Sequence, residues 1–359
     1  MSALASPSPS ATPAQPRLTS LSHGGGCGCK IAPGVLSEIL KGTSAMPIPK
    51  ELLVGIETAD DAAVYQLNDE QALIATTDFF MPIVDDPYDF GRIAATNAIS
   101  DVYAMGGRPI MALALVGMPI NVLPQETIRR ILEGGQDVCR AAGIPIAGGH
   151  TIDSVEPIYG LVALGLVHPG QVKRNADAQV GDRLILGKPL GVGILSAALK
   201  KDAVDANGYA QMIATTTKLN TPGPELAALT GVHALTDITG FGLAGHTLEL
   251  ARGAKCSITV DWAKVPLLDG VRDLAKAGYV TGASGRNYAA YGHDIALPAD
   301  FPTEDKALLS DPQTSGGLLV SCAPDCVEQV LEIFHRHGFE AAAEIGEITP
   351  QQGSLLNIC

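Results

Sequence analysis

Residues 72–118 read ALIATTDFFMPIVDDPYDFGRIAATNAISDVYAMGGRPIMALALVGM, and this stretch decides the fold. It opens with an apolar, strand-like run at 72–78 and closes with a second one at 110–118. Between them, residues 90–105 have helical spacing, with Ile93, Asn97 and Asp101 on one face. A helix that connects two strands is typical of α/β and α+β domains, so we expect a mixed sheet covered by helices.

The same alternation extends outward along the chain in both directions. A helix predicted at 124–142 starts with a proline and ends at Gly143, as helices often do. In the first half we also predict a helix at 34–41 and strands at 144–147 and 159–168. In the second half we predict strands at 183–186, 234–238, 257–260, 317–322 and 343–348, and helices at 242–251, 267–277 and 324–337.

The length of 359 residues is enough for about two domains. Residues 1–16 contain Ser, Ala and Pro without charge, which predicts a disordered tail. The polar stretch 171–182 is the predicted boundary, so the domains are expected at 17–170 and 171–359. Both halves mix strands and helices, and the predicted fold class is therefore α/β (α+β) in two domains.

Charge and composition exclude several classes of protein. The formal net charge is −14 and no run of Lys or Arg occurs, which argues against nucleic-acid binding. An acidic protein can still bind a polyanion when metal ions supply the positive charge. The longest apolar run, 109–120, is too short to span a membrane, and the N-terminus does not resemble a secretory signal. Seven scattered cysteines are typical of a reducing compartment, so we expect a cytoplasmic location.

The segment HGGGCGCK at 23–30 places two cysteines in a pliable glycine loop. Cys27 on such a mobile loop can reach a substrate and then close over it. Lys30 is expected to favour the reactive thiolate, or to bind a phosphate as a point charge. A surface turn with incidental cysteines remains an alternative, as does a site for a soft metal.

Several carboxylates follow or flank apolar runs, where burial is unfavourable unless something neutralises the charge. Arg and Lys are scarce near them, and Mg²⁺ prefers such oxygen ligands together with substrate phosphates. For any single aspartate, the capping of a helix or turn is the simpler interpretation. The aspartates are Asp60, Asp61, Asp78, Asp101 and Asp237.

Two glycine-rich segments suggest sites for a nucleotide. Residues 147–151 (AGGHT) follow a predicted strand, where paired glycines allow backbone N–H groups to approach a phosphate or ribose, although a plain tight turn is equally compatible. Residues 240–245 (GFGLAG), with Asp261 beyond them, imitate a dinucleotide-binding fingerprint, which leaves a nicotinamide oxidoreductase as an alternative. No P-loop motif is present in the sequence.

Six segments, in this order, resemble the selenophosphate synthetase (selenide, water dikinase) family, within the aminoimidazole ribonucleotide synthetase-like superfamily. The resemblance runs from about Leu18 to the C-terminus, and the Cys-Gly-Cys-Lys loop joined to the block 76–107 is its most specific part. The segments are 23–30, LLVGIETADDAAVY (52–65), 76–107, AGGHTID (147–153), LTDITGFGLAGH (235–246) and DPQTSGGLL (311–319).

The resemblance implies an enzyme that converts ATP, selenide and water into selenophosphate, AMP and orthophosphate with Mg²⁺. It also implies a homodimer whose N-terminal domains form a shared β-barrel, with ATP near the interface and a C-terminal α+β sandwich in each subunit. Cys27 and Lys30 would be catalytic, and the metal ligands would be Asp61, Asp101 and Asp237. The implied nucleotide contacts are Lys30, Thr58, Ala59, Asp60, Asp78, Asp101, Gly149, His150 and Thr151.

Overall fold

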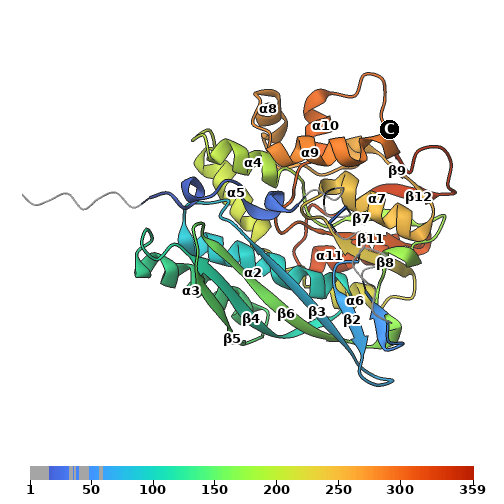
Figure 1. Cartoon of the computed structure of the whole chain (residues 1–359). Helices are drawn as coiled ribbons and strands as arrows, with labels where there is room; N and C mark the ends of the chain where they lie inside the picture. Colours follow the sequence, from blue (N-terminus) through green and yellow to red (C-terminus); the bar gives the residue numbers. More distant parts are fainter. Residues whose placement is uncertain (1–15, 32–34, 36–37, 40–47, 56–59) are drawn as a thin grey trace, which may run out of the picture.

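Two β-sheets organise the chain, one in each half (Figure 1). The structure is a computed structural model that describes residues 16–31, 35, 38, 39, 48–55 and 60–359. The predicted tail at 1–16 and the predicted helix at 34–41 therefore lie almost entirely outside the described residues, as do Thr58 and Ala59.

The first sheet has six strands in the order β1-β2-β3-β6-β4-β5. All neighbouring pairs are antiparallel except β4 and β5, which are parallel and connected through a helix. The strands are β1 (Leu52–Val54), β2 (Ala63–Gln66), β3 (Ala72–Phe80), β4 (Arg108–Met118), β5 (Ile146–Asp153) and β6 (Ile158–Val167).

Helices α2 (Pro87–Ala104) and α3 (Gln125–Ala141) cover one face of this sheet (Figure 1). The Asp86 side chain caps α2 by accepting a hydrogen bond from the Asp89 N–H, and a proline occupies the first turn. α2 is buried on nearly all sides because it lies among the sheet, α3 and the second half of the chain. The opposite face of the sheet carries no described helix, and Phe79 and Ile152 there are 52% and 55% exposed.

Of the two alternatives for 147–151, the tight turn is excluded, because β5 continues through these residues to Asp153. Gly149 lies opposite Ala114 of β4, and a Cβ at this position would be 2.1 Å from the Ala114 carbonyl oxygen. Gly149 therefore allows the two strands to approach closely. The turn-like composition of 147–151 hid a strand that lies at the edge of the sheet.

The second sheet has seven strands in the order β10-β13-β9-β12-β7-β11-β8. The strands are β7 (Arg183–Leu186), β8 (Val232–Asp237), β9 (Ser257–Val260), β10 (Ile295–Ala296), β11 (Leu318–Cys322), β12 (Ala343–Thr349) and β13 (Leu356–Ile358). The helices are α4 (Val192–Leu199), α5 (Ala206–Thr216), α6 (Gly223–Ala227), α7 (Gly242–Ala254), α8 (Val271–Lys276), α9 (Gly282–Tyr291), α10 (Thr303–Leu309) and α11 (Val327–Arg336).

Helices pack on both faces of this second sheet. On β11, Val320 packs in one apolar cluster with Phe334 of α11, whereas Leu319 packs in another with Leu248 of α7. Neighbouring residues of a strand point to opposite faces, so the sheet lies between two layers of helices. The expectation of mixed α/β structure in both halves is confirmed.

The dinucleotide-binding interpretation of 240–245 is wrong. It requires β8 and β9 to be adjacent parallel strands, but β12, β7 and β11 lie between them and β8 pairs antiparallel with β11. The segment instead begins α7 directly after the strand that carries Asp237.

Side chains from the N-terminal segment connect the two halves. Arg17 forms ion pairs with Asp85 at 2.6 Å and with Asp202 at 3.0 Å, and Leu18 beside it is fully buried. At another point of the junction, the Asn175 N–H donates to Asp60 Oδ1 at 2.7 Å.

Among the described residues, no helix is both long and apolar enough to cross a lipid bilayer.

Candidate active site

Three of the predicted carboxylates converge where the two halves meet. Asp61, just before β2, Asp101 of α2 and Asp237 at the end of β8 each offer an oxygen, and these atoms lie within 4.8 Å of one another. The residues are far apart in sequence, so only the packing of α2 between the two sheets brings them together. We call this group the aspartate cluster.

Each member of the cluster is held by a hydroxyl group. Thr76 Oγ1 donates to Asp101 Oδ2 at 2.5 Å, and Thr236 Oγ1 donates to Asp61 Oδ1 at 2.9 Å. Ser100 Oγ donates to Asp237 Oδ2. Asp61 Oδ2 is buried and has no hydrogen-bond partner.

Burial and mutual repulsion raise the pKa of Asp61 and Asp101 well above the ordinary value for aspartate. Burial also raises the pKa of Asp237, against the hydrogen bond from Ser100. Three clustered carboxyl groups with an unpartnered oxygen fit a hard divalent cation, which prefers oxygen ligands and stabilises the charged form. The residues present therefore fit Mg²⁺.

The loop that carries Cys27 is folded into the same junction. Cys27 is 1% exposed, its N–H donates to Thr314 Oγ1 at 3.1 Å, and its Sγ donates to Asn97 Oδ1 at 3.1 Å. Asn97 Nδ2 in turn donates to Asp78 Oδ2 at 2.6 Å. Asn97 thus connects the thiol with an aspartate of β3.

Lys30 acts on Cys27 in the expected direction, because its charge lowers the pKa of the thiol, but in this conformation burial has the larger effect. Burial raises the pKa of the Cys27 thiol well above its ordinary value, and Asp78 adds to this effect. Lys30 lowers the pKa by less than these effects raise it. With the loop in this position, Cys27 is a thiol that donates a hydrogen bond to Asn97 Oδ1.

Lys30 lies between the cysteine loop and the acidic side chains. Its Nζ is 3.8 Å from Asp78 Oδ1, and the side chain is 40% exposed. Burial lowers the pKa of Lys30, but Asp78 and the neighbouring acidic groups outweigh this effect, so the net shift is upward. The lysine is therefore a fixed positive charge beside Asp78 and Cys27.

The segment 311–317 belongs to one of the six motif segments but had no predicted role, and it forms one wall of the junction. Ser315 has a φ of +55°, and its N–H donates to Asn97 Oδ1 at 2.8 Å. Lys188 Nζ donates to the Ser315 carbonyl at 2.9 Å. This polar segment is wholly buried. The sequence feature that could have indicated its role is a polar run that leads directly into the apolar strand β11.

The predicted nucleotide contacts do not all lie together. Asp78 and Asp101 are at the junction, and Asp60 is nearby with its carboxylate bonded to Asn175 N–H. The group 149–151 lies on β5, which β6 and β4 separate from β3. That is roughly 14 Å across the sheet at about 4.8 Å per strand.

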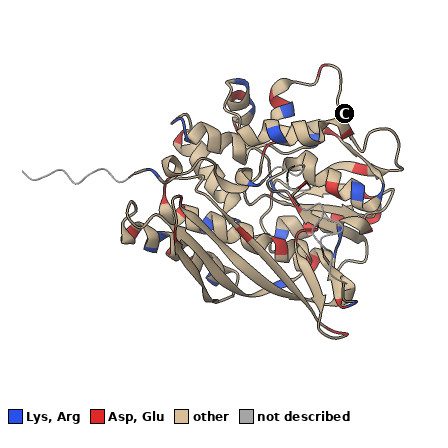
Figure 2. Ribbon diagram, in the orientation of Figure 1, with Lys and Arg blue, Asp and Glu red and all other residues tan. Residues whose placement is uncertain are grey.

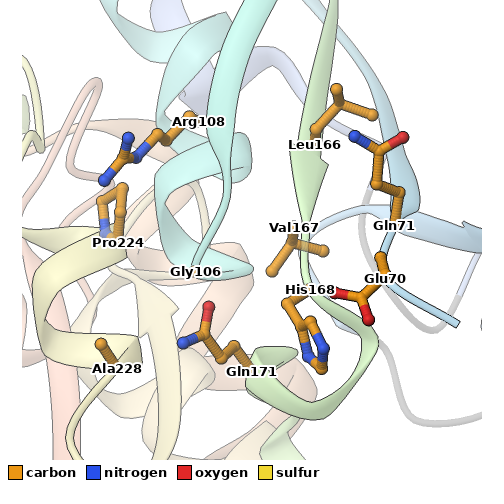
Figure 3. Close-up of a pocket in the computed structure, with 10 residues that line it drawn as sticks. All are labelled: Glu70, Gln71, Gly106, Arg108, Leu166, Val167, His168, Gln171, Pro224 and Ala228. Atoms are coloured by element: carbon orange, nitrogen blue, oxygen red, sulfur yellow. The ribbon is translucent and has the colours of Figure 1, made fainter.

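A separate cleft of about 290 Å³ lies near Gly106, Arg108 and His168 (Figure 3). None of the predicted site residues that the structure describes lines it. Lys and Arg are scattered over the described part of the ribbon and form no continuous basic stretch along any element (Figure 2).

Comparison with family models defines the class of protein. Residues 59–167 match the N-terminal domain of AIR synthase related proteins, and residues 179–357 match the C-terminal domain. The chain therefore has the two-domain architecture of the AIR synthase-related class, with one sheet in each half of the chain.

Sequence relatives give the family within this class. The chain is 72% identical over 335 residues to selenide, water dikinase of Burkholderia pseudomallei (strain K96243), which covers 93% of this chain and 95% of the relative. It is 58% identical over 331 residues to the protein of that name from Rhizobium meliloti (strain 1021), covering 92% and 95%. The chain belongs to the selenide, water dikinase family, which confirms the resemblance seen in its motifs, and it is a kinase-type enzyme.

Solved structures share the fold at low sequence identity. Thiamine-monophosphate kinase from Stenotrophomonas maltophilia K279a has a TM-score of 0.63 and 20% identity, covering 92% of this chain and 96% of that one. The hydrogenase maturation protein HypE in complex with ATP has a TM-score of 0.58 and 18% identity, covering 82% and 81%. At these identities the similarity establishes the fold alone.

Proposed function

We propose that this protein synthesises selenophosphate from ATP, selenide and water, releasing AMP and orthophosphate. Membership of the selenide, water dikinase family supports this reaction. The observation that carries the proposal is the position of the aspartate cluster beside Cys27 and Lys30. Phosphoryl transfer depends mainly on positioning and charge neutralisation, and this junction offers both.

Asp61, Asp101 and Asp237 are the proposed ligands of Mg²⁺. When bound, the cation neutralises phosphate charge that the acidic protein would otherwise repel. Thr76 and Thr236 orient two of the carboxylates through hydrogen bonds. The unpartnered Asp61 Oδ2 is the oxygen most available to a new ligand.

Lys30 is proposed to neutralise phosphate charge. Cys27 is proposed to bind or activate the selenium substrate. The raised pKa of Lys30 keeps the side chain protonated, so it offers a positive charge beside Asp78. Asp78, Asp60 and Asp101 are proposed nucleotide contacts at this junction. Movement of the loop 23–30 would expose Cys27 to water, remove the burial that raises its pKa and thus favour the thiolate. Closure of the loop would shield an easily oxidised selenium anion from solvent.

A homodimer is proposed to complete the site. One face of the first sheet is open, and a pocket of about 220 Å³ on it is almost wholly apolar, between Phe79, His150 and Ile152. A second copy covering this face would bury these groups and close the two sheets into a shared β-barrel. Because Gly149, His150 and Thr151 lie three strands from Asp78, we propose that they contact the nucleotide bound mainly by the partner subunit.

We propose a reducing compartment, the cytoplasm, as the location of the protein. All seven cysteines are free, including the buried Cys27. A thiol that handles selenium must stay reduced, which an oxidising compartment does not allow.

Phosphorus NMR of the products tests the reaction. Anaerobic incubation with ATP, Mg²⁺ and selenide is expected to give selenophosphate, AMP and orthophosphate in equal amounts. ADP as the final nucleotide, or AMP release that does not require selenide, would overturn the proposal. Candidate amides or amines in place of selenide serve as controls for another acceptor.

The Cys27→Ser variant tests the role of the thiol. It is expected to lose selenide-dependent turnover and to retain ATP binding, because Cys27 donates to Asn97 rather than to the aspartate cluster. Turnover at the wild-type rate would show that Cys27 has no part in the reaction.

A further inference from the structure

A cleft of about 300 Å³ lies on the outer side of the cysteine loop. Its walls are the loop itself, the helices α4 and α9 with the segments that flank them, and the segment that contains Thr314. It is distinct from the aspartate cluster, none of whose members lines it. The proposed function gives it no role.

The charges that line this outer cleft are of one sign. Its lining cations are Lys200, Lys201 and Arg286, and no aspartate or glutamate that the structure describes lines it. His23 also lines the cleft, and its ring contacts the Glu156 carboxylate at 2.9 Å. Within the described part of the chain, none of the two lysines and Arg286 forms an ion pair with a carboxylate. In a chain with a net charge of −14, such a cleft is a local region of positive potential.

Two of these cations contact the backbone of the loop. Lys200 Nζ donates to the Gly24 carbonyl at 3.3 Å, and Arg286 Nη2 donates to the Gly28 carbonyl at 3.1 Å. The positive charges therefore lie directly against the segment that holds Cys27.

A second, much smaller cavity lies behind the outer cleft. It measures about 10 Å³, and Cys27, Lys30 and Gly240 are among its lining residues. Gly28, Ala283 and Arg286 line both spaces. The outer cleft is thus separated from the thiol and from Lys30 by a thin wall that includes Arg286.

We propose that the outer cleft is the entrance for the anion to be phosphorylated, hydroselenide, and that Lys200, Lys201 and Arg286 attract it toward Cys27. This inference rests on the proposed function. ATP with its metal binds at the aspartate cluster, so the two anionic substrates reach the reaction centre from different sides. Separate routes avoid the repulsion that two anions would experience in one passage.

Steady-state kinetics of a charge-removed variant test the entrance. For the double variant Lys200→Gln, Lys201→Gln, kcat/KM for selenide is expected to fall about tenfold at low salt, because focusing by charge accelerates capture of anions. KM for ATP should remain unchanged. The wild-type kcat/KM for selenide should also fall with ionic strength, and the variant should show a flatter dependence.

Arg286 is tested by a pair of substitutions. Arg286→Gln is expected to lower kcat/KM for selenide, and Arg286→Lys to recover most of it, because the positive charge is retained. Lys264→Gln, which removes a charge from the short helix Trp262–Lys264 away from the cleft, is the matched control and should behave as wild type. Equal selenide kinetics and salt dependence in all variants would overturn the inference.

The same assay distinguishes the incoming anion from the departing one. If the cleft binds orthophosphate instead, the double variant will change product inhibition by phosphate and leave kcat/KM for selenide unaltered. That outcome contradicts the inference.

An activity-independent measurement separates the failure of the entrance from the failure of the proposed reaction. Iodoacetate is an anion and iodoacetamide is neutral, yet both alkylate thiols after the same opening of the loop. The ratio of their rates at Cys27, located by mass spectrometry, should fall at least about threefold in the double lysine variant. An unchanged ratio overturns the inference even if the wild-type protein makes no selenophosphate.

Discussion

Asp61 has one carboxylate oxygen bonded to Thr236 and one buried oxygen without a partner. Two further carboxylates lie within 4.8 Å, and Lys30, whose ammonium is 3.8 Å from Asp78, is a nearby cation. Burying like charges in this way is unfavourable in the absence of a counter-ion. The arrangement of these carboxylates therefore favours the binding of a cation and destabilises the folded protein when no cation is bound.

The variant Asp61→Asn tests whether Asp61 is a ligand of the cation. It removes one charged ligand and is expected to raise the Mg²⁺ concentration needed for half-maximal activity by at least about tenfold, or roughly 1.4 kcal/mol. The increase in Tm that Mg²⁺ produces should also shrink. Asp69→Asn, in the exposed turn before β3, is the matched control. A wild-type response of Asp61→Asn to Mg²⁺ would exclude Asp61 as a ligand.

Asp311 gives the stability of the protein a defined pH dependence. Burial raises the pKa of Asp311 to about 7, despite hydrogen bonds from the Ile194 N–H and from Gln313. The folded state therefore holds a proton that the unfolded state has already released, so stability falls as pH rises toward and through 7.

Between pH 5.5 and 8 this carboxyl group should lower the free energy of unfolding by about 2 kcal/mol. Asp311→Asn removes the titrating group and should lose that part of the pH dependence. Urea unfolding of both proteins at several pH values measures the difference. Parallel profiles would show that Asp311 has an ordinary pKa in the folded protein.

Helices α2 and α3 approach each other through glycines. A Cβ on Gly91 of α2 would be 1.9 Å from the Ile131 carbonyl oxygen of α3, and a Cβ on Gly134 of α3 would be 2.1 Å from the Tyr88 carbonyl oxygen of α2. This close contact fixes α2 against the sheet. Because α2 carries both Asn97 and Asp101, helix packing positions part of the site.

At this scale we expect Gly134→Ala to destabilise the protein. The added methyl group meets backbone rather than a movable side chain, so the two helices must separate, at a cost of about 1–3 kcal/mol. Gln136→Ala, at an exposed position of the same helix, should change stability by less than about 0.5 kcal/mol. Urea unfolding compares them, and equal stability of the two variants would contradict the packing argument.

The whole molecule is asymmetric in how its sheets are covered. The second sheet lies between two layers of helices, whereas one face of the first sheet is open and exposes Phe79 and Ile152. Apolar side chains gathered on an open sheet face indicate an interface. The proposed homodimer would give both sheets two covered faces.

Phe79→Glu tests the dimer. A charge at the centre of an apolar interface is expected to raise the dissociation constant of the dimer at least about thirtyfold, or roughly 2 kcal/mol. Sedimentation velocity measures the dissociation constant of the dimer. Val180→Glu, which alters an exposed apolar residue before β7, is the matched control. A wild-type protein that sediments as a monomer, or a Phe79→Glu variant that remains dimeric, would contradict this interface.

The sequence predicted the long elements well because their patterns are strong. β3, β4, α2 and α3 all appear where the apolar spacing placed them. The helix α4 was missed because VGILSAAL has almost no polar face and so no helical period. The extent of strand β5 was misjudged because its paired glycines are typical of turns, yet Gly149 allows close contact with β4.

The chemical identity of the site residues was readable along the chain, because Cys27, Lys30 and the aspartates stand in distinctive local patterns. The environment of these residues in the folded protein could not be read from the sequence. The link that Asn97 makes between Cys27 and Asp78, the burial that keeps Cys27 a thiol, and the basic cleft beside the loop all depend on tertiary packing. Cys27 and Asn97, for example, are 70 residues apart in the sequence. Side-chain types and short-range periodicity are local properties of a chain, whereas desolvation and the electrostatic field arise from whatever the fold packs around each group.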